Sequence, residues 1–374
     1  MECIINGKLI LKDKVVNMNL YFENGIIKEI SNRVPSTETV INANHCYVSA
    51  GFVDIHTHGR GGIDTMDIDK NNINTLSMAH LKTGVTTFLP TTMTMPVDRI
   101  SHAIDIIDEM KDHVTGAKIG GVHLEGPFIN KIYKGAQSEE CIIAPTLENY
   151  KKLTSHPELI KKITLAPEVV KEEELIPYLT SQGVSVSIGH TNASYNEALK
   201  AIEAGANSTT HTYNAMTPLK HRDPGVVGAA MTQNVYAELI LDGIHVSYPA
   251  ASILWKMKGP DHLVLITDSL EAASMEEGTY HLGGQEVFVK DGQARLKDGT
   301  LAGSIVAMNQ AIKNARDHLG MSLCEAVNCA TRNPAQSIHN DKIGRLETNC
   351  AADFVFFDED LNIKQVYING ERRI

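Results

Sequence analysis

The sequence lacks several features that would place it in a specialised class of protein. No apolar run approaches the roughly 18 residues needed to cross a bilayer, so no membrane-spanning segment is expected. Basic side chains are outnumbered, with 34 Lys and Arg against 45 Asp and Glu and a formal net charge of −11. A nucleic-acid binder needs a basic surface to meet many phosphates, so the acidic balance argues against that function.

Cysteines are few, and none forms a C-x-x-C pair. The chain has six, scattered over 374 residues, which argues against a disulfide framework. The opening residues, MECIINGKLILKDKVV, alternate apolar and polar types and carry lysines where a signal peptide needs a continuous apolar segment. We therefore expect a cytoplasmic protein with reduced thiols.

The composition is that of an ordinary globular protein. Hydrophobic residues make up 43% of the chain and charged residues 21%, which is typical of a soluble domain. At roughly 150 residues per domain the length suggests about two domains, although one α/β barrel can occupy about 200–250 residues by itself.

Both ends of the chain have a β pattern. Residues 1–50 hold short alternating segments, and Asn6-Gly7 and Asn24-Gly25 are hairpin signals within them. Residues 343–374 repeat the pattern and contain another such pair, Asn369-Gly370. This predicts one small β-sandwich domain assembled from both termini.

The middle of the chain, residues 51–342, alternates short β-branched runs with longer helical patterns. Eight strands are expected there, at residues 52–59, 84–91, 117–125, 162–168, 184–190, 206–211, 237–243 and 262–268. Eight strand–helix units that close on themselves predict an α/β fold of the TIM-like (β/α)8 barrel type. A β-rich insertion is expected at residues 276–300.

Titratable side chains recur at the carboxyl ends of five of these strands, where a barrel of this type places its catalytic residues. His56 and His58 end the first strand, and their Cα atoms lie about 6.6 Å apart on one face. The other candidates are Glu125, His190, His211 and Asp268.

Imidazole nitrogen and carboxylate oxygen form the ligand set of Zn, Fe, Co or Mn in catalytic sites. A bound divalent ion lowers the pKa of water towards about 7, and a carboxylate beside it can carry the proton. Asp268 is the candidate for that proton transfer. A lone histidine at a strand end is more often structural, and His123 is interpreted that way because it lies one layer deeper than Glu125. The agreement of position among six residues favours a metal site.

A second cluster follows the sixth strand. The loop from Asn214 to Gly225 contains Lys220-His221-Arg222, which could bind an anion at the barrel mouth or be a solvated charged loop. His245 follows the seventh strand, and the segment Leu301–Ser304 is expected to turn into a helix with Ser304 as its N-cap.

The motifs GFVDIHTHG, GVHLEGPF, SIGHT, HTYNAMTP, ELILDGIH, LITD and TLAGS, in this order, give the sequence a resemblance to a known family. The chain resembles the amidohydrolase superfamily and, within it, the N-acetylglucosamine-6-phosphate deacetylase family, along nearly its whole length. The resemblance implies metal-dependent hydrolysis of the N-acetyl group of N-acetyl-D-glucosamine 6-phosphate, giving D-glucosamine 6-phosphate and acetate.

Site residues are also implied by the resemblance. Glu125, His190 and His211 hold the principal metal, His56 and His58 add a second metal with Glu125 bridging, and Asp268 is the general acid and base. The implied substrate contacts are Ala136, Asn214, Ala215, Arg222, Asp242, Gly243, Ile244, His245, Leu301, Ala302, Gly303 and Ser304. The family commonly forms homodimers, in which a phosphate ligand can come from the neighbouring subunit.

Two alternatives stay open from the sequence. Another amidohydrolase, such as a cyclic amidase or an N-acyl-amino-acid deacylase, could use the same barrel, but an uncharged substrate would not require the Lys220-His221-Arg222 loop. A non-catalytic scaffold on this fold should have lost ligands, whereas every expected ligand is present.

Overall fold

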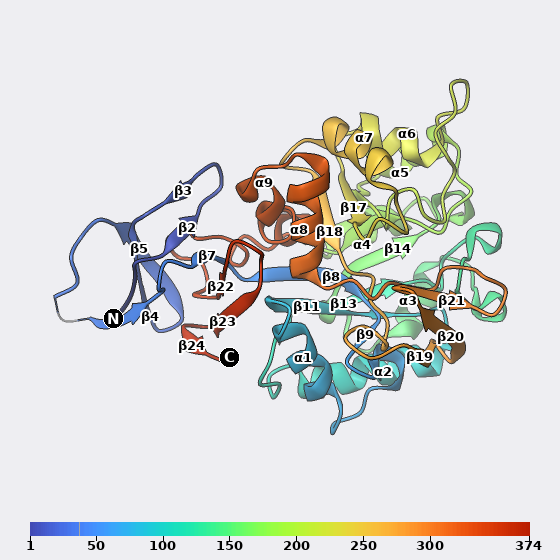
Figure 1. The fold of residues 1–374 in the computed structure, drawn as a ribbon. Helices are drawn as coiled ribbons and strands as arrows, with labels where there is room; N and C mark the ends of the chain where they lie inside the picture. The colour runs from blue at the N-terminus through green and yellow to red at the C-terminus, as the bar shows by residue number, and fades with distance from the viewer. Residues whose placement is uncertain (37) are drawn as a thin grey trace.

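The computed structural model describes residues 1–36 and 38–374. Its central feature is the expected barrel (Figure 1), whose strands run β11-β13-β14-β15-β16-β17-β18, with β8 paired to β11. An isolated parallel bridge between Thr57 and Ser269 links β8 to the end of β18 and closes the ring. The barrel strands are β8 (Phe52–Thr57), β11 (Val85–Thr92), β13 (Val122–Glu125), β14 (Ile160–Leu165), β15 (Ser185–Ile188), β16 (Ser208–Thr209), β17 (Tyr236–Ile240) and β18 (Leu263–Ile266).

One expected strand is interrupted. Residues 117–125 form β12 (Lys118–Ile119) and β13 rather than a continuous strand. The break falls at Gly120 and Gly121, and Gly121 has a φ of +132°, a conformation that residues with a side chain rarely adopt.

Helices cover the outside of the barrel and follow the strands along the chain (Figure 1). Their bounds are α1 (Ile73–Leu81), α2 (Val97–Met110), α3 (Leu147–Leu153), α4 (Leu175–Ser181), α5 (Tyr195–Glu203), α6 (Gly225–Thr232), α7 (Tyr248–Lys258), α8 (Met308–Leu319), α9 (Leu323–Asn328) and α10 (Arg332–Ser337). Local sequence sets where they begin: Ser194 caps α5 and Ser322 caps α9, each in a capping box with a glutamate three residues later. No helix in the described ranges combines the length and apolar character that a membrane span requires.

Two sheets from the chain ends form a separate β unit beside the barrel. One has the order β5-β4-β1-β6, from β1 (Glu2–Ile5), β4 (Asn19–Glu23), β5 (Ile26–Ser31) and β6 (Thr39–Asn42). The other has the order β24-β23-β22-β7-β2-β3, from β2 (Lys8–Ile10), β3 (Val15–Val16), β7 (Tyr47–Ala50), β22 (Phe354–Phe357), β23 (Ile363–Ile368) and β24 (Glu371–Arg372). The two termini therefore meet in one unit, as the sequence predicts.

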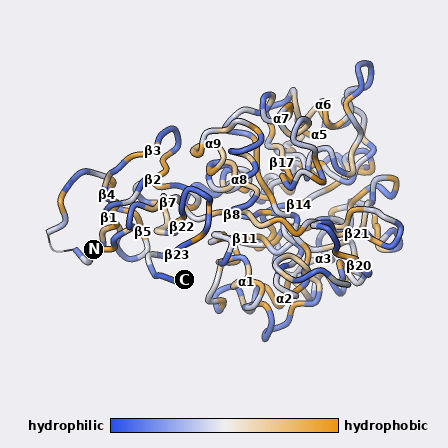
Figure 2. The backbone as a smooth tube through the Cα atoms, in the orientation of Figure 1, coloured by the Kyte–Doolittle hydropathy of each residue, from blue (hydrophilic) through white to orange (hydrophobic). Residues whose placement is uncertain are grey.

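The side-chain alternation of β22 joins this unit to the barrel. Phe354 and Phe356 belong to the hydrophobic core of the β unit, whereas Val355 and Phe357 belong to the barrel core. In Figure 2 the tips of the projecting loops are hydrophilic. The expected insertion is a three-stranded sheet, β19 (Gly278–Leu282), β20 (Gln285–Lys290) and β21 (Gln293–Leu296).

Candidate active site

The six titratable residues predicted from strand ends lie together at one end of the barrel. His56 is in β8, His58 follows it, and Glu125 is the last residue of β13. His190, His211 and Asp268 follow β15, β16 and β18 within two residues, and all three have positive φ angles, of 47°, 30° and 47°. Such backbone strain in residues with side chains concentrates at functional sites, where surrounding structure maintains it.

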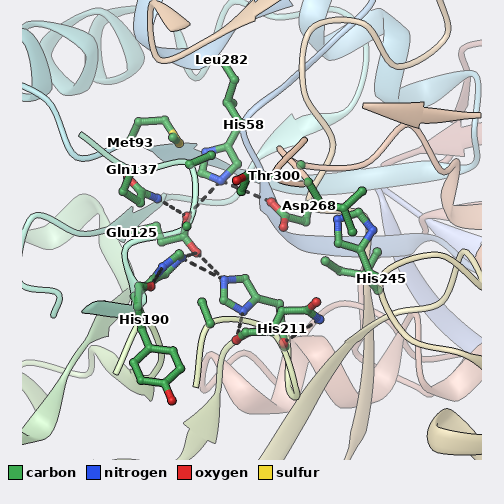
Figure 3. A pocket seen from close by; sticks show the side chains of 18 of the residues that line it. His58, Met93, Glu125, Gln137, His190, His211, His245, Asp268, Leu282 and Thr300 are labelled. Carbon is green, nitrogen blue, oxygen red and sulfur yellow. Dashed lines mark hydrogen bonds and ion pairs between the residues drawn. The ribbon is translucent and has the colours of Figure 1, made fainter. Parts of the chain in front are cut away.

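Glu125 is the centre of the cluster (Figure 3). Its Oε1 lies 3.3 Å from Nε2 of His56, 3.3 Å from Nε2 of His190 and 3.1 Å from Nε2 of His211. Its Oε2 lies 3.1 Å from Nε2 of His58. One carboxylate therefore contacts four imidazoles, each through the same ring nitrogen.

The other ring nitrogen of each histidine has a separate partner. Nδ1 of His58, His190 and His211 lies 3.1, 2.9 and 3.2 Å from the backbone carbonyl oxygens of Thr91, Tyr133 and Asn214. Because a carbonyl can only accept, each Nδ1 donates its hydrogen, and each ring, when neutral, presents the Nε2 lone pair to the cluster. This is the arrangement of metal-binding histidines, whose second nitrogen is oriented by a hydrogen-bond acceptor.

The donor set fits a metal. Two groups, His56 with His58 and Glu125, and Glu125 with His190 and His211, each hold three ligand atoms within 4.8 Å of one another. Among the described residues, Nε2 of His56 and Oε1 of Glu125 are buried and have no hydrogen-bond partner. Buried polar atoms are usually paired in proteins, and a cation held by these residues would supply the missing partner of both atoms.

The pKa shifts in the cluster also favour the binding of a cation. Burial alone lowers the pKa of an imidazole, yet Glu125 and Asp268 raise the pKa of His56 well above its usual value and that of His58 to about 9. Burial alone raises the pKa of a carboxyl, yet His56 and His190 hold the pKa of Glu125 well below its usual range. A site that stabilises protons on imidazoles so strongly also favours a divalent cation in their place.

Asp268 differs from Glu125 in its surroundings. Its Oδ1 lies 3.4 Å from Nε2 of His56 and 3.3 Å from Nε2 of His58, and its side chain is 10% exposed, toward the cavity. Although burial raises the pKa of this carboxyl, His56 and His58 lower it overall. Asp268 is therefore ionised at neutral pH and accessible to a molecule in the cavity.

His123 is structural, as the sequence suggests. It is fully buried below the cluster, with Nε2 2.8 Å from Oγ1 of Thr164 and Nδ1 3.3 Å from Oγ1 of Thr91. Burial lowers the pKa of His123 well below its usual value, which keeps the ring neutral.

A cavity of about 320 Å³ opens over the cluster, large enough for a monosaccharide derivative. Predicted residues that line it are His58, Glu125, Ala136, His190, His211, Asn214, Ala215, His245, Asp268, Leu301 and Gly303. Predicted residues outside the lining are His56, Arg222, Asp242, Gly243, Ile244, Ala302 and Ser304.

Asp242 supports His245 rather than reaching the cavity. Its Oδ1 accepts hydrogen bonds of 2.8 Å from the backbone N–H groups of Ile244 and His245, and its Oδ2 lies 2.6 Å from Nδ1 of His245. His245 consequently keeps Nε2 for a ligand, on the side of Asp268 away from Glu125 in Figure 3.

Arg222 does not meet the cavity of its own chain. It is exposed in the loop at residues 217–224, which projects beside α6 (Figure 1). Within the described ranges its side chain makes no hydrogen bond or ion pair. Arg222 is therefore not part of the cavity lining of its own subunit.

Ser304 is not a helix cap, which corrects the sequence prediction. Helix α8 begins at Met308 with Ala307 as its N-cap. Ser304 instead forms an isolated parallel bridge with Ser269, which follows β18. Its backbone N–H donates to the Asp268 carbonyl at 2.7 Å and its hydroxyl donates to the Thr267 carbonyl. This places Gly303 and Leu301 in the cavity wall.

Sequence reasoning missed several residues of the site. Gln137 donates from Nε2 to Oε2 of Glu125 at 2.7 Å, and nothing in its local sequence indicates this. Glu238 contacts His56 from the barrel interior, and its position inside the apolar run AELIL was an available signal. Met93 and Leu282 give the cavity apolar walls.

Comparisons with known proteins agree with this geometry. Residues 47–373 match the model of the Amidohydrolase family. The chain is 36% identical over 361 residues to the N-acetylglucosamine-6-phosphate deacetylase of Lysinibacillus sphaericus, covering 96% of this chain and 93% of that one. It is 34% identical to the N-acetylgalactosamine-6-phosphate deacetylase of Escherichia coli O157:H7, covering 86% of each chain.

A solved structure is similar over the whole molecule. The crystal structure of N-acetylglucosamine-6-phosphate deacetylase from Pasteurella multocida matches with a TM-score of 0.94 and 32% identity, covering 99% of both chains. The family match spans most of the sequence and includes the strands that carry the clustered histidines and carboxylates. The chain therefore belongs to the amidohydrolase family.

Proposed function

We propose that this protein hydrolyses the N-acetyl group of N-acetyl-D-glucosamine 6-phosphate to D-glucosamine 6-phosphate and acetate. The observation that carries the proposal is the cavity that joins the cluster around Glu125 to the buried, ionised Asp268, with His245 farther along its wall. The names of the relatives with 36% and 32% identity support the same reaction.

Two divalent cations are proposed: His56, His58 and Glu125 would hold one, and Glu125, His190 and His211 would hold the other. The ligand types accept Zn, Fe, Co or Mn. When bound, such an ion lowers the pKa of water towards about 7 and polarises a carbonyl oxygen. The histidines and Glu125 would hold these ions, and Gln137 orients Glu125 through its 2.7 Å hydrogen bond.

Asp268 transfers the proton of the reaction. It accepts a proton from the attacking water as the new C–O bond forms at the acetyl carbonyl carbon. It then donates that proton to the amide nitrogen as the C–N bond breaks, so that acetate and the amine are released. A side chain that acts first as base and then as acid must be ionised before the reaction, which the lowered pKa of Asp268 provides.

Recognition of the substrate is assigned to the rest of the cavity. His245, held by Asp242, is proposed to bind the phosphate. Arg222 is proposed to bind it from the other subunit of a homodimer, since its exposed side chain makes no hydrogen bond or ion pair with the described residues of its own chain. The sugar contacts are proposed to come from Ala136, Asn214, Ala215 and the segments 242–245 and 301–304. Binding energy from the phosphate would position the acetamido group against Asp268.

Two further proposals concern the whole chain. The domain boundaries are residues 1–50 and 343–374 for the β-sandwich and 51–342 for the barrel, supported by the separate hydrophobic core of the two terminal segments. Six free cysteines support a reducing, cytoplasmic location.

Acetate release from the purified protein tests the reaction. With N-acetylglucosamine 6-phosphate we expect acetate and free amine in equal amounts, loss of activity in a chelator, and recovery on adding Zn²⁺, Co²⁺ or Mn²⁺. N-acetylgalactosamine 6-phosphate is the second candidate substrate, because a relative with 34% identity bears that name. A higher kcat/KM for N-acetylgalactosamine 6-phosphate would make that sugar the proposed substrate. Hydrolysis of cyclic amides, without hydrolysis of either sugar phosphate, would overturn both substrate proposals.

A further inference from the structure

A buried ion pair lies in the barrel interior below the metal-ligand cluster. Lys162 of β14 and Glu238 of β17 have no exposed surface, and Nζ of Lys162 lies 2.9 Å from Oε1 of Glu238. The interior of such barrels is usually filled by branched apolar side chains. Burying two charges costs free energy that their attraction does not always offset, so the core alone does not explain the pair.

The second oxygen of Glu238 contacts the cluster. Oε2 lies 3.2 Å from Nδ1 of His56 and 3.2 Å from the backbone N of His211. Both groups donate to it. A single carboxylate oxygen therefore contacts one member of each of the two ligand groups, His56 in the first and His211 in the second.

His56 is the histidine that depends most on this contact. The other three histidines of the cluster donate Nδ1–H to backbone carbonyls. Only His56, among these four, has a side-chain carboxylate as its acceptor, and that acceptor is itself held by an ammonium. With its Nδ1 donating to Glu238, the ring presents Nε2 to Glu125 at 3.3 Å.

We propose that Glu238, held by Lys162, is a positioning residue for the metal centre. It fixes the tautomer and orientation of His56 and the backbone position of His211, and so sets the geometry of both ligand groups. Glu238 does not line the cavity and does not contact substrate. The inference rests on the proposed metal centre but not on the proposed substrate.

Glu238→Gln is the test variant. Lys162 donates to Oγ of Ser208 at 3.1 Å and has Glu238 as its charged partner, so we expect the glutamine carbonyl to turn to the ammonium and the amide NH2 to face the two N–H donors of His56 and His211. We expect the weaker of two metal equivalents to lose affinity by about 10–100-fold, the usual effect of removing such a contact. Competition with a chromophoric chelator measures the affinity, and the visible spectrum of the Co²⁺ form reports the changed ligand geometry.

The double variant Lys162→Met with Glu238→Gln separates positioning from charge balance. Without the ammonium, the glutamine carbonyl is free to accept from His56 and His211, so metal affinity should recover most of the loss. Asp353→Asn is the matched control, because Asp353 is also buried and paired with a lysine, Lys118, but touches none of the ligands. It should lower thermal stability and leave metal affinity unchanged.

The outcomes are distinct. Wild-type metal affinity in Glu238→Gln would overturn the inference, and so would a double variant whose metal affinity does not recover. If Glu238→Gln does not fold, the metal affinity of the double variant alone tests the inference: an affinity near that of the wild type supports it, and a weak affinity overturns it. A wild-type protein that binds no divalent ion would overturn the metal centre and this inference together. A wild-type protein that binds metal but does not release acetate would overturn the proposed function alone.

Discussion

Glu125 and Asp268 show how the surroundings of two carboxylates divide their tasks. Glu125 is engaged on both oxygens by four imidazoles and Gln137. The contacts of the Asp268 carboxylate with described residues all involve Oδ1, which leaves Oδ2 for a molecule in the cavity. Glu125 is therefore suited to hold cations and Asp268 to move a proton.

Asp268→Asn removes the proton acceptor while keeping the shape of the side chain. We expect kcat to fall by about 10²–10⁴-fold, the usual contribution of a general acid and base. Metal content and KM should change little, because the ligand groups do not include Asp268. Steady-state kinetics with metal analysis of the same preparation checks this, and turnover near that of the wild type would remove Asp268 from the mechanism.

Metal binding should release protons at neutral pH. The pKa of His58 is raised to about 9 by the neighbouring carboxylates, so in the metal-free protein its ring is protonated at pH 7.5. A metal requires the neutral ring, so its affinity should increase as pH rises towards about 9. Calorimetric titration in buffers of different ionisation enthalpy measures the protons released; a heat that does not depend on the buffer would contradict the expectation.

At the scale of elements, the sheet of β19, β20 and β21 forms one wall of the cavity. Leu282, at the end of β19, lines the cavity, and Gln285 donates to the carbonyl of Ala136 on the facing segment. The backbone N–H of Gly283 donates to Oδ2 of Asp64 at 3.1 Å. Two hydrogen bonds thus hold the turn between β19 and β20 against the barrel.

Gln285→Ala tests this wall. A neutral hydrogen bond contributes about 0.5–1.5 kcal/mol, so KM should rise by up to about tenfold while kcat stays nearly constant. Gln293→Ala is the control, since Gln293 lies on the same sheet and the hydrogen bonds of its side chain with described residues are to Arg295, at the surface. Equal kinetics for the two variants would show that the contact with Ala136 does not support substrate binding.

At the scale of the whole molecule, the site needs a second subunit if Arg222 binds phosphate. Arg222→Ala should lower kcat/KM for the phosphorylated sugar by about 10–100-fold, since a hydrogen bond to a charged group contributes about 1.5–3 kcal/mol. The kcat/KM for an unphosphorylated sugar should not change. In a mixture of Arg222→Ala and Asp268→Asn chains, refolded together, one hybrid site carries both native residues.

Activity of that mixture above the average of the two variants supports a shared site. Activity no higher than the average, from chains shown by light scattering to be dimers, would place Arg222 outside the phosphate site.

The sequence predicted the barrel, the β unit from both ends and the six clustered residues, because these depend on short-range patterns and on the rule that parallel strands end on one side. It could not predict the interruption at Gly121, the start of α8 at Met308 or the contact of Gln137 with Glu125. Each of these depends on how segments distant in the chain pack together. The sequence could also not predict that Arg222 is exposed, since a basic loop has the same residue pattern whether it faces solvent or a cavity.

The proposed function is tested most directly by kcat/KM for N-acetylglucosamine 6-phosphate compared with N-acetylglucosamine. We expect acetate release from both, with a preference of at least about 10²-fold for the phosphorylated sugar, equivalent to the loss of about 2.7 kcal/mol of binding in the transition state without the phosphate. Equal kcat/KM for the two sugars would contradict this expectation.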